Sequence, residues 1–184
     1  MTSSANDGAA TVLTPASDSA IYRRYVLFML LIVNFLGFLD RQILNILAEP
    51  IKVDLDLSDT QIGLLTGLAF ALLYTVLGLP IARIADRGNR VWVITASLTV
   101  WSAFTAACGF AQNYLQLLLA RMGVGIGEAG CSPSSHSLLS DYVPRENRAF
   151  GLGLCSMGVP LGRMAGMAFG GMIAQVHGWR TAMM

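Results

Sequence analysis

Long apolar stretches alternate with short polar joints along the chain. The stretches cover about residues 25–48, 62–82, 91–111, 114–139 and 149–176. Each is long enough to cross a hydrocarbon core of about 30 Å, which takes roughly 20 helical residues. They are too long for membrane β-strands and lack their strict alternation. The pattern predicts an all-α membrane protein with five transmembrane helices and a sixth that begins at about Thr181.

Residues 1–20 differ from the rest of the chain. They are rich in Ser, Thr, Ala and Gly and contain no Lys or Arg, so they lack the positive start and the apolar core of a secretory signal. We expect a flexible cytoplasmic tail, followed by a transmembrane bundle over residues 21–184. Because a helix that ends inside a bilayer leaves carbonyl groups unpaired, we also expect the sequence to be part of a longer protein.

Basic residues are distributed unevenly between the two sides of the predicted bundle. One side has seven arginines and the other has two basic residues, and membrane proteins keep the excess of Lys and Arg in the cytoplasm. We therefore expect an integral protein of a bacterial inner membrane with a cytoplasmic N-terminus. The seven are Arg23, Arg24, Arg83, Arg87, Arg90, Arg145 and Arg148, and the two are Lys52 and Arg180.

Composition narrows the function classes further. Hydrophobic residues make up 54% of the 184 and charged residues 12%, about half the charge of an average soluble domain, which is roughly 25%. The net charge of +1 and the odd count of three cysteines argue against a nucleic-acid partner and against a disulfide framework. We expect membrane lipid as the surrounding medium, and no metal or cofactor.

Five ionisable residues interrupt the predicted spans: Asp40, Arg41, Arg121, Glu128 and Arg163. A charge at the centre of a membrane helix costs roughly 2.5–3.5 kcal/mol on insertion scales, so such residues face a partner or a wet cavity. Purely structural pairing is the competing explanation, and it is strongest for Arg163. For the other four we favour a transport role.

The spacing of these charges suggests their chemistry. Asp40 and Arg41 are adjacent, so on a helix they point about 100° apart and each needs a partner from elsewhere. Arg121 and Glu128 lie seven residues apart on one helical face. We expect Asp40 and Glu128 to exchange protons, while Arg41 and Arg121 pair with these carboxylates or with an anionic substrate. His136 extends the same face, either as a relay or as a structural hydrogen-bond donor.

The fifth predicted span carries a stripe of glycines at intervals of four, including Gly158, Gly162 and Gly166. Small residues at this spacing let two helices approach closely in a membrane. The stripe therefore predicts a partner helix that runs alongside, and Pro160 adds a point where the span can bend.

Several motifs together carry a family resemblance. The segment 82–90, Ala-Arg-Ile-Ala-Asp-Arg-Gly-Asn-Arg, resembles the G-x-x-x-D-R-x-G-R signature of the major facilitator superfamily, although Ala82 and Asn89 replace usual glycines. Arg121-x-Gly123-x-Gly125 is similar to the family's R-x-G-x-G motif. Segment 158–162 looks like its glycine-proline motif with one inserted residue, and Gly178-Trp179-Arg180 resembles the turn before helix six.

This resemblance implies a fold of two six-helix halves with the substrate between them at mid-membrane. The chain would be the N-terminal half. Its partner would be the missing C-terminal half, which we expect to supply the helix that packs on the glycine stripe. The family pattern also implies that Asp86, Arg87 and Arg90 form a cytoplasmic gate that ties the inner helix ends together.

Three shorter segments, Phe38–Gln42, Leu57–Gly63 and Gly127–Ala129, look like the spinster-like group of that superfamily. This implies proton-coupled transport of a lysolipid or sphingoid phosphate by alternating access. A proton symporter of organic anions and a drug-type exporter remain the alternatives, since organic-anion symporters share the Asp-Arg pair.

The residues also bear on functions other than transport. An intramembrane hydrolase would use Ser132 or Ser135 with His136, but no G-x-S-x-G turn frames either serine, so we expect no enzyme. A scaffold or a half-length subunit was a further alternative, against which the mid-helix stop argues.

Overall fold

The protein is an all-α bundle, as the hydrophobic pattern predicts. The computed structural model describes residues 20–183, except the side chains of Ala20, Ala69, Ala82, Ala85, Asp86 and Arg87. The predicted tail therefore lies outside the described residues. The elements are α1 (Ala20–Asp54), α2 (Asp59–Gly63), η2 (Leu64–Leu68), α3 (Ala69–Arg87), α4 (Arg90–Gly109), α5 (Tyr114–Tyr142), η3 (Arg145–Asn147), α6 (Arg148–Ser156), α7 (Gly158–Ala165), η4 (Gly166–Gly170) and α8 (Gly171–Met183).

Short polar side chains begin three of the helices. Ser58 accepts a hydrogen bond from the backbone of Gln61, whose side chain in turn accepts one from the backbone of Ser58. Asn89 caps α4, and Asn113 caps α5 by accepting from the backbone N–H of Gln116 at 3.0 Å. Each cap satisfies amide groups that the first turn of a helix leaves unpaired. The polar joints of the sequence therefore set where these helices start.

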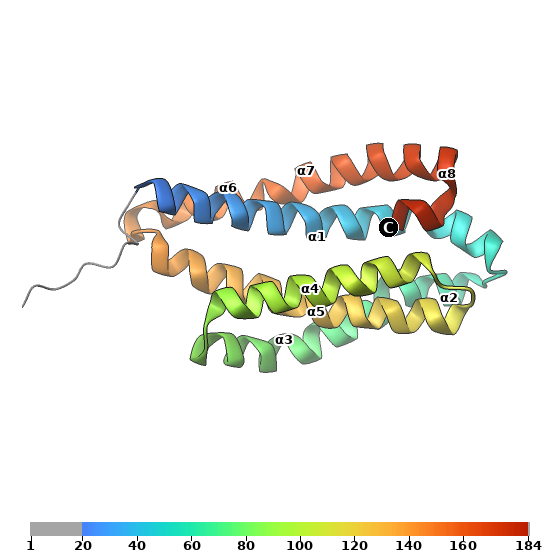
Figure 1. Ribbon diagram of the computed structural model, residues 1–184, viewed down its shortest axis with the longest axis horizontal. Coiled ribbons are helices and arrows are strands. Elements are labelled where there is room, and N and C mark those ends of the chain that lie inside the picture. The colour runs from blue at the N-terminus through green and yellow to red at the C-terminus, as the bar shows by residue number, and fades with distance from the viewer. Residues whose placement is uncertain (1–19, 184) are drawn as a thin grey trace, which may run out of the picture.

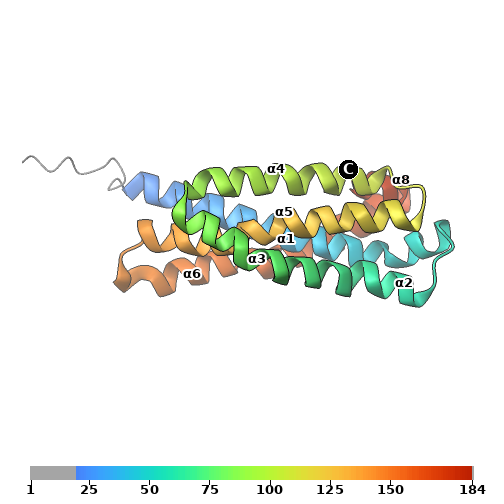
Figure 2. The ribbon, with the colours of Figure 1, turned by 90° about the horizontal axis from the view of Figure 1, so that it is seen from below.

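Two of the long rods are composite. The α2, η2 and α3 segments continue one another (Figure 2), and η2 is a wider π-helical turn. The α6, α7, η4 and α8 segments form the other rod, which breaks at Met157, shortly before Pro160, a residue that cannot donate a backbone hydrogen bond. Gly178, at φ 82°, ends this rod and turns the chain back. The predicted sixth helix therefore starts just after Gly178, slightly before the expected start at Thr181.

The rods differ in how apolar they are. Within the described residues 20–183, four stretches are long and apolar enough to cross a membrane: Ile21–Asp54, Asp59–Ile81, Arg90–Gly109 and Arg145–Met183. The fourth predicted span, residues 114–139, which forms α5, is not among these four. Much of α5 is buried among its neighbours, and a helix that other helices shield from lipid can carry polar residues.

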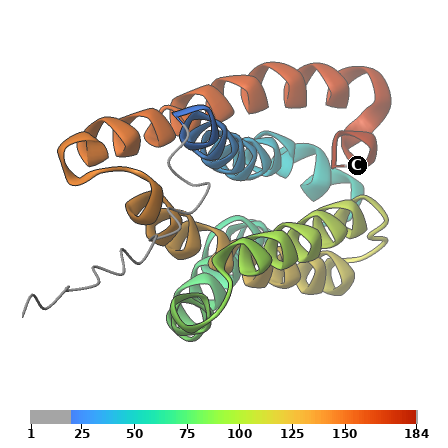
Figure 3. The ribbon, with the colours of Figure 1, turned by 60° about the vertical axis from the view of Figure 1, so that its left-hand side comes forward.

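The rods are arranged in two layers with α1 at their boundary. The α6–α8 rod runs along one side of α1, and α3, α4 and α5 form the other layer (Figures 1 and 3). We call the end that contains the start of α1 and the joints 87–90 and 142–148 the basic end. A larger apolar core, including Leu47, Leu117 and Cys108, lies toward the opposite end, and a smaller one, including Val26 and Leu139, lies toward the basic end.

The glycine stripe packs on α1, so the expectation that the missing half supplies its partner helix is wrong. A side chain at Gly158 would lie 2.8 Å from the carbonyl oxygen of Leu31, and one at Gly166 would lie 2.9 Å from that of Leu39. Gly162 faces the backbone of α1 between them. The stripe lets two helices of the same chain approach at backbone distance, which sequence spacing alone could not assign to a particular partner.

Candidate functional site

Four of the five charges within the spans meet between α1 and α5. Arg121 Nη1 lies 3.1 Å from Asp40 Oδ2, and Arg41 Nη2 lies 2.8 Å from Glu128 Oε1. We call Asp40–Arg121 the enclosed pair and Arg41–Glu128 the cavity pair. Each neighbour on α1 thus takes its partner from α5, and the four charges sum to zero.

Helix geometry explains this crossed pairing. Consecutive residues on α1 diverge by about 100°, so Asp40 and Arg41 cannot pair well with each other. Arg121 and Glu128 stand two turns apart on the same face of α5, and they therefore offer two separate partners. Side chains on a helix lean toward its N-terminus, which on α1 is the direction of the basic end. Arg41 therefore reaches Glu128, which lies two turns nearer that end than Arg121 does.

The two pairs differ in exposure. The Arg121 side chain is 2% exposed and that of Asp40 is 8% exposed. Glu128 is equally buried at 8%, but its partner Arg41 is 33% exposed. Asp40 also borders a groove between α1 and α4 that is lined mainly by apolar side chains. Among the four charged residues, Arg41 is therefore the one most open to a ligand.

Aromatic rings surround the Arg41 guanidinium. Its central carbon lies 4.7 Å from the ring centroid of Phe70, 5.3 Å from that of Tyr74 and 5.4 Å from that of Phe38. Phe70 also lies 5.7 Å from the guanidinium carbon of Arg121, so one ring serves both pairs. Such contacts stabilise a cation that has left bulk water.

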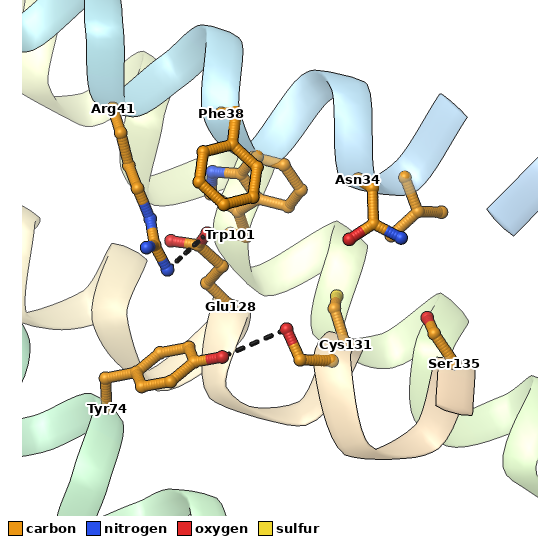
Figure 4. A pocket seen from close by; sticks show the side chains of 11 residues that line it. Asn34, Phe38, Arg41, Tyr74, Trp101, Glu128, Cys131 and Ser135 are labelled. Atoms are coloured by element: carbon orange, nitrogen blue, oxygen red, sulfur yellow. Dashed lines mark hydrogen bonds and ion pairs between the residues drawn. The ribbon is translucent and has the colours of Figure 1, made fainter. Parts of the chain in front are cut away.

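A small cavity of about 70 Å³ opens beside the cavity pair on the side of the basic end. Figure 4 shows Arg41 and Glu128 on its wall. The Tyr74 hydroxyl donates a hydrogen bond to the hydroxyl of Ser132 at 2.9 Å. Within residues 20–183, Glu128 Oε2 and the Ser135 hydroxyl are buried without a hydrogen-bond partner. Buried polar atoms of this kind are normally satisfied, so the cavity is suited to hold a few water molecules.

The remaining predicted residues lie outside this cluster. His136 is exposed and does not line the cavity. Arg163 is exposed on α7, with its guanidinium 5.3 Å from the Phe38 ring. Arg90 forms an ion pair with Asp141, which joins the start of α4 to the end of α5. The side chains of the other two predicted gate residues, Asp86 and Arg87, lie outside the described part of the chain.

Sequence reasoning missed two aromatic rings at this site and the partner of Arg90 outside it. Phe70 and Tyr74 sit in an apolar run without any distinguishing signal, although their spacing of four puts both rings on one helical face. Asp141 lies at the end of α5. In the sequence, only its negative charge, opposite to that of the neighbouring arginines, could have indicated that it pairs with Arg90.

Comparisons with known proteins find several relatives of this chain. The Major Facilitator Superfamily model matches residues 30–184. The chain is 43% identical over 155 residues to an MFS-type efflux pump of Mycolicibacterium smegmatis, covering 84% of this chain and 36% of the pump. It is 34% identical over 132 residues to a probable sphingolipid transporter, spinster homolog 1, of Arabidopsis thaliana, covering 72% of this chain and 27% of that protein.

A solved structure is similar to the chain as well. The crystal structure of a bacterial homolog of the human lysosomal transporter Spinster, inward-facing and unoccupied, superposes with a TM-score of 0.82 at 47% identity. The match covers 86% of this chain and 33% of that one. The chain thus spans about a third of the length of these relatives.

Proposed function

The chain belongs to the Major Facilitator Superfamily, and from this premise we propose that it forms the N-terminal half of a proton-coupled secondary transporter for an amphipathic anion. The substrate class we favour is a lysolipid or sphingoid phosphate. Glu128 exchanges the coupling proton, and Arg41 pairs with Glu128 or with the substrate. The single observation that carries this proposal is the crossed set of two ion pairs, one of which borders a cavity.

The chemistry of the cavity pair supports coupling. While Glu128 is ionised, it holds Arg41 at 2.8 Å. Protonation of Glu128 removes the opposing charge, and the arginine is then free to bind an anion through its planar fork of donors. An anion and the Glu128 carboxylate therefore compete for one guanidinium. Such competition links the binding of a proton to the binding of a substrate without any covalent step.

The enclosed pair has a different part in this proposal. Asp40 and Arg121 tie α1 to α5 in the larger apolar core, beside Leu44 and Val124. A buried charge that loses its partner is strongly destabilising, so this pair keeps the two helices in register while the cavity pair opens. Both carboxylates remain candidates for proton exchange, with Glu128 first because it lines the cavity and its second oxygen has no hydrogen-bond partner among the described residues.

The choice of substrate rests on the relatives. A solved relative is a spinster homolog, and a curated one carries the name of a probable sphingolipid transporter. Both names fit a ligand with a charged head and an apolar tail. The aromatic wall around Arg41 fits such a molecule too, since the rings offer apolar contact beside the cation.

We further propose that the basic end faces the cytoplasm of a bacterial inner membrane. Seven arginines lie on that side, against Lys52 and Arg180 on the other, which follows the usual excess of positive charge inside. In this orientation the cavity beside Glu128 lies toward the cytoplasm, and Arg90 with Asp141 lies at the inner helix ends. The predicted gate of Asp86, Arg87 and Arg90 belongs to the same proposal.

The test is uphill transport by the full-length protein in proteoliposomes with an imposed proton gradient. We expect Glu128→Gln to abolish accumulation of a lysolipid against its gradient, while downhill exchange continues, because the glutamine cannot take up a proton. Asp59→Asn is the matched control, since Asp59 is an exposed carboxylate at the opposite end. Accumulation by Glu128→Gln equal to that of the unmodified protein would disprove the proposal. If the unmodified protein accumulated small organic anions but no lysolipid, the proposed substrate class would be wrong.

A further inference from the structure

A second pair of polar residues lies next to the cavity pair, on the side of the basic end. On α1, Asn34 precedes Arg41 by seven residues, and on α5, Ser135 follows Glu128 by seven. Residues seven apart on a helix share a face and are separated by about 10 Å along the axis. Because α1 starts at the basic end and α5 finishes there, both steps lead in the same direction. We call Asn34 and Ser135 the polar rung.

The polar rung and the cavity pair line the same cavity of about 70 Å³. Figure 4 shows Asn34 and Ser135 on one side of it and Arg41 and Glu128 on the other. Since a molecule of liquid water takes roughly 30 Å³, this volume accepts about two of them. Two waters in a row give three hydrogen-bonded steps of about 2.8 Å each, which is comparable to the distance between the rung and the pair.

The wall of the cavity offers water both donors and acceptors. The amide N–H of Asn34 donates to a backbone carbonyl of the preceding turn at 3.0 Å, which leaves its carbonyl oxygen as an acceptor. Ser132 accepts from Tyr74, which leaves its own O–H as a donor. Among the described residues, Glu128 Oε2 and the Ser135 hydroxyl have no hydrogen-bond partner. These groups suffice for bound water, which typically makes about three hydrogen bonds.

The two unpartnered oxygens are enclosed by helices of this chain, so their lack of a partner does not depend on further protein around the bundle. Both side chains nevertheless line the cavity. The last torsion of a glutamate is soft, and a serine hydroxyl moves between staggered positions. A small rotation of Glu128 or Ser135 therefore brings its oxygen to water in the cavity.

Glu128 is the one carboxyl group among the described residues that line the cavity. The other titratable groups on this wall are Arg41 on α1, the phenol of Tyr74 on α3 and the thiol of Cys131 on α5, while α4 contributes none. None of these is a carboxylate or an imidazole, the groups that exchange protons readily near neutral pH. The enclosed pair lies on the other side, in the larger apolar core. A proton that leaves Glu128 therefore meets hydroxyl groups and water toward the basic end.

We propose that the polar rung is a water-binding site and that Glu128 exchanges its proton through the water held there. The proposal rests on the proposed transport function and adds Asn34 and Ser135 to it as positioning residues, which act on Glu128 through water. On release, the O–H bond of the Glu128 carboxyl breaks as the adjoining water takes the proton and passes one of its own to the next molecule. The carboxylate that remains pairs with Arg41, as it does in the structure.

The experiment is a rapid pH jump on the full-length protein in detergent, with neither substrate nor gradient. Time-resolved infrared spectroscopy follows the carboxyl C=O band that Glu128→Gln lacks. Ser135→Val removes the hydroxyl and fills its place, whereas Ser135→Thr has nearly the same shape and keeps it. We expect the band of Ser135→Val to reach its full amplitude about tenfold or more slowly, because the relaying water is displaced. Ser135→Thr should respond at close to the rate of the unmodified protein.

A second recording, in water labelled with the heavy oxygen isotope, detects the bound water itself. An O–H stretching band that shifts with the isotope should be present in the unmodified protein and in Ser135→Thr and absent in Ser135→Val. Ser134 supplies the control of position, because its hydroxyl is also buried without a partner among the described residues but does not line the cavity. Ser135→Ala should therefore slow the carboxyl band more than Ser134→Ala does.

Equal rates in Ser135→Val and Ser135→Thr would overturn the proposal, and a change in amplitude at an unchanged rate would make Ser135 a packing residue. If the valine variant does not fold, the two alanine variants decide, and equal rates in them would overturn the proposal as well. Failure of the proposed function has a different signature. In that case the unmodified protein itself would show no Glu128 band after the pH jump.

Discussion

The two ion pairs between α1 and α5 use the same chemistry in different surroundings. The enclosed pair has an arginine that is 2% exposed and a core of leucine and valine around it. The cavity pair has an arginine that is 33% exposed, three aromatic rings and a polar cavity. The two ion pairs therefore differ in burial, a difference that their residue types alone do not indicate. We propose that the cavity pair opens at low cost, while the enclosed pair keeps α1 and α5 together.

The largest effect should come from breaking the enclosed pair. Arg121→Met leaves the Asp40 carboxylate buried and unpaired, and we expect a loss of about 3–5 kcal/mol in the free energy of unfolding. Arg41→Met should cost less, about 1–2 kcal/mol, because the cavity can hydrate Glu128. Denaturant unfolding of the full-length protein in detergent measures both. Equal losses would remove the distinction between the pairs, and adding Asp40→Asn should recover part of the Arg121→Met loss.

A smaller effect should follow from removing the ring that both pairs share. Phe70→Leu keeps an apolar side chain but loses the cation–π contacts to Arg41 and Arg121, and we expect a loss of about 1–2 kcal/mol. Phe28→Leu is the control, because Phe28 is exposed. The same unfolding assay applies. If Phe70→Leu were as harmless as the control, the rings would not contribute to holding the guanidinium groups.

The smallest change in stability should come from a substitution aimed at the cavity pair alone. A side chain at Gly37 would lie 3.1 Å from Glu128 Oε1, so Gly37→Ala pushes the carboxylate slightly away from Arg41. We expect the free energy of unfolding to change by less than about 0.5 kcal/mol, since the helix itself gains from alanine. Accumulation against a gradient should fall below that of the unmodified protein. Gly153→Ala, with open space around it in α6, should raise the free energy of unfolding by up to about 1 kcal/mol and leave accumulation unchanged.

Much of the fold follows from the sequence because membrane helices are specified locally. Apolar length, polar joints and caps such as Asn113 determine where the helices begin and end. The pairing of helices is not local, and the glycine stripe shows this. The spacing of Gly158, Gly162 and Gly166 indicates close contact with some helix, but every neighbour is compatible with it until the chain is folded.

The site shows the same division. Arg121 and Glu128 can be recognised in the sequence as charged residues in an apolar span, and their spacing predicts a shared face. Which carboxylate each arginine takes depends on the offset between α1 and α5, which no single-helix pattern contains. The exposure of Arg41 and the rings of Phe70 and Tyr74 depend on a third helix, so they become visible only in the structure.

The central claim is that the carboxylate of the cavity pair exchanges the proton. Infrared difference spectroscopy of the full-length protein, recorded on addition of oleoyl lysophosphatidic acid, detects the C=O stretch of a carboxyl group that gains or loses a proton. We predict a band that disappears in Glu128→Gln and persists in Asp40→Asn. A band that persists in Glu128→Gln and disappears in Asp40→Asn would contradict the account.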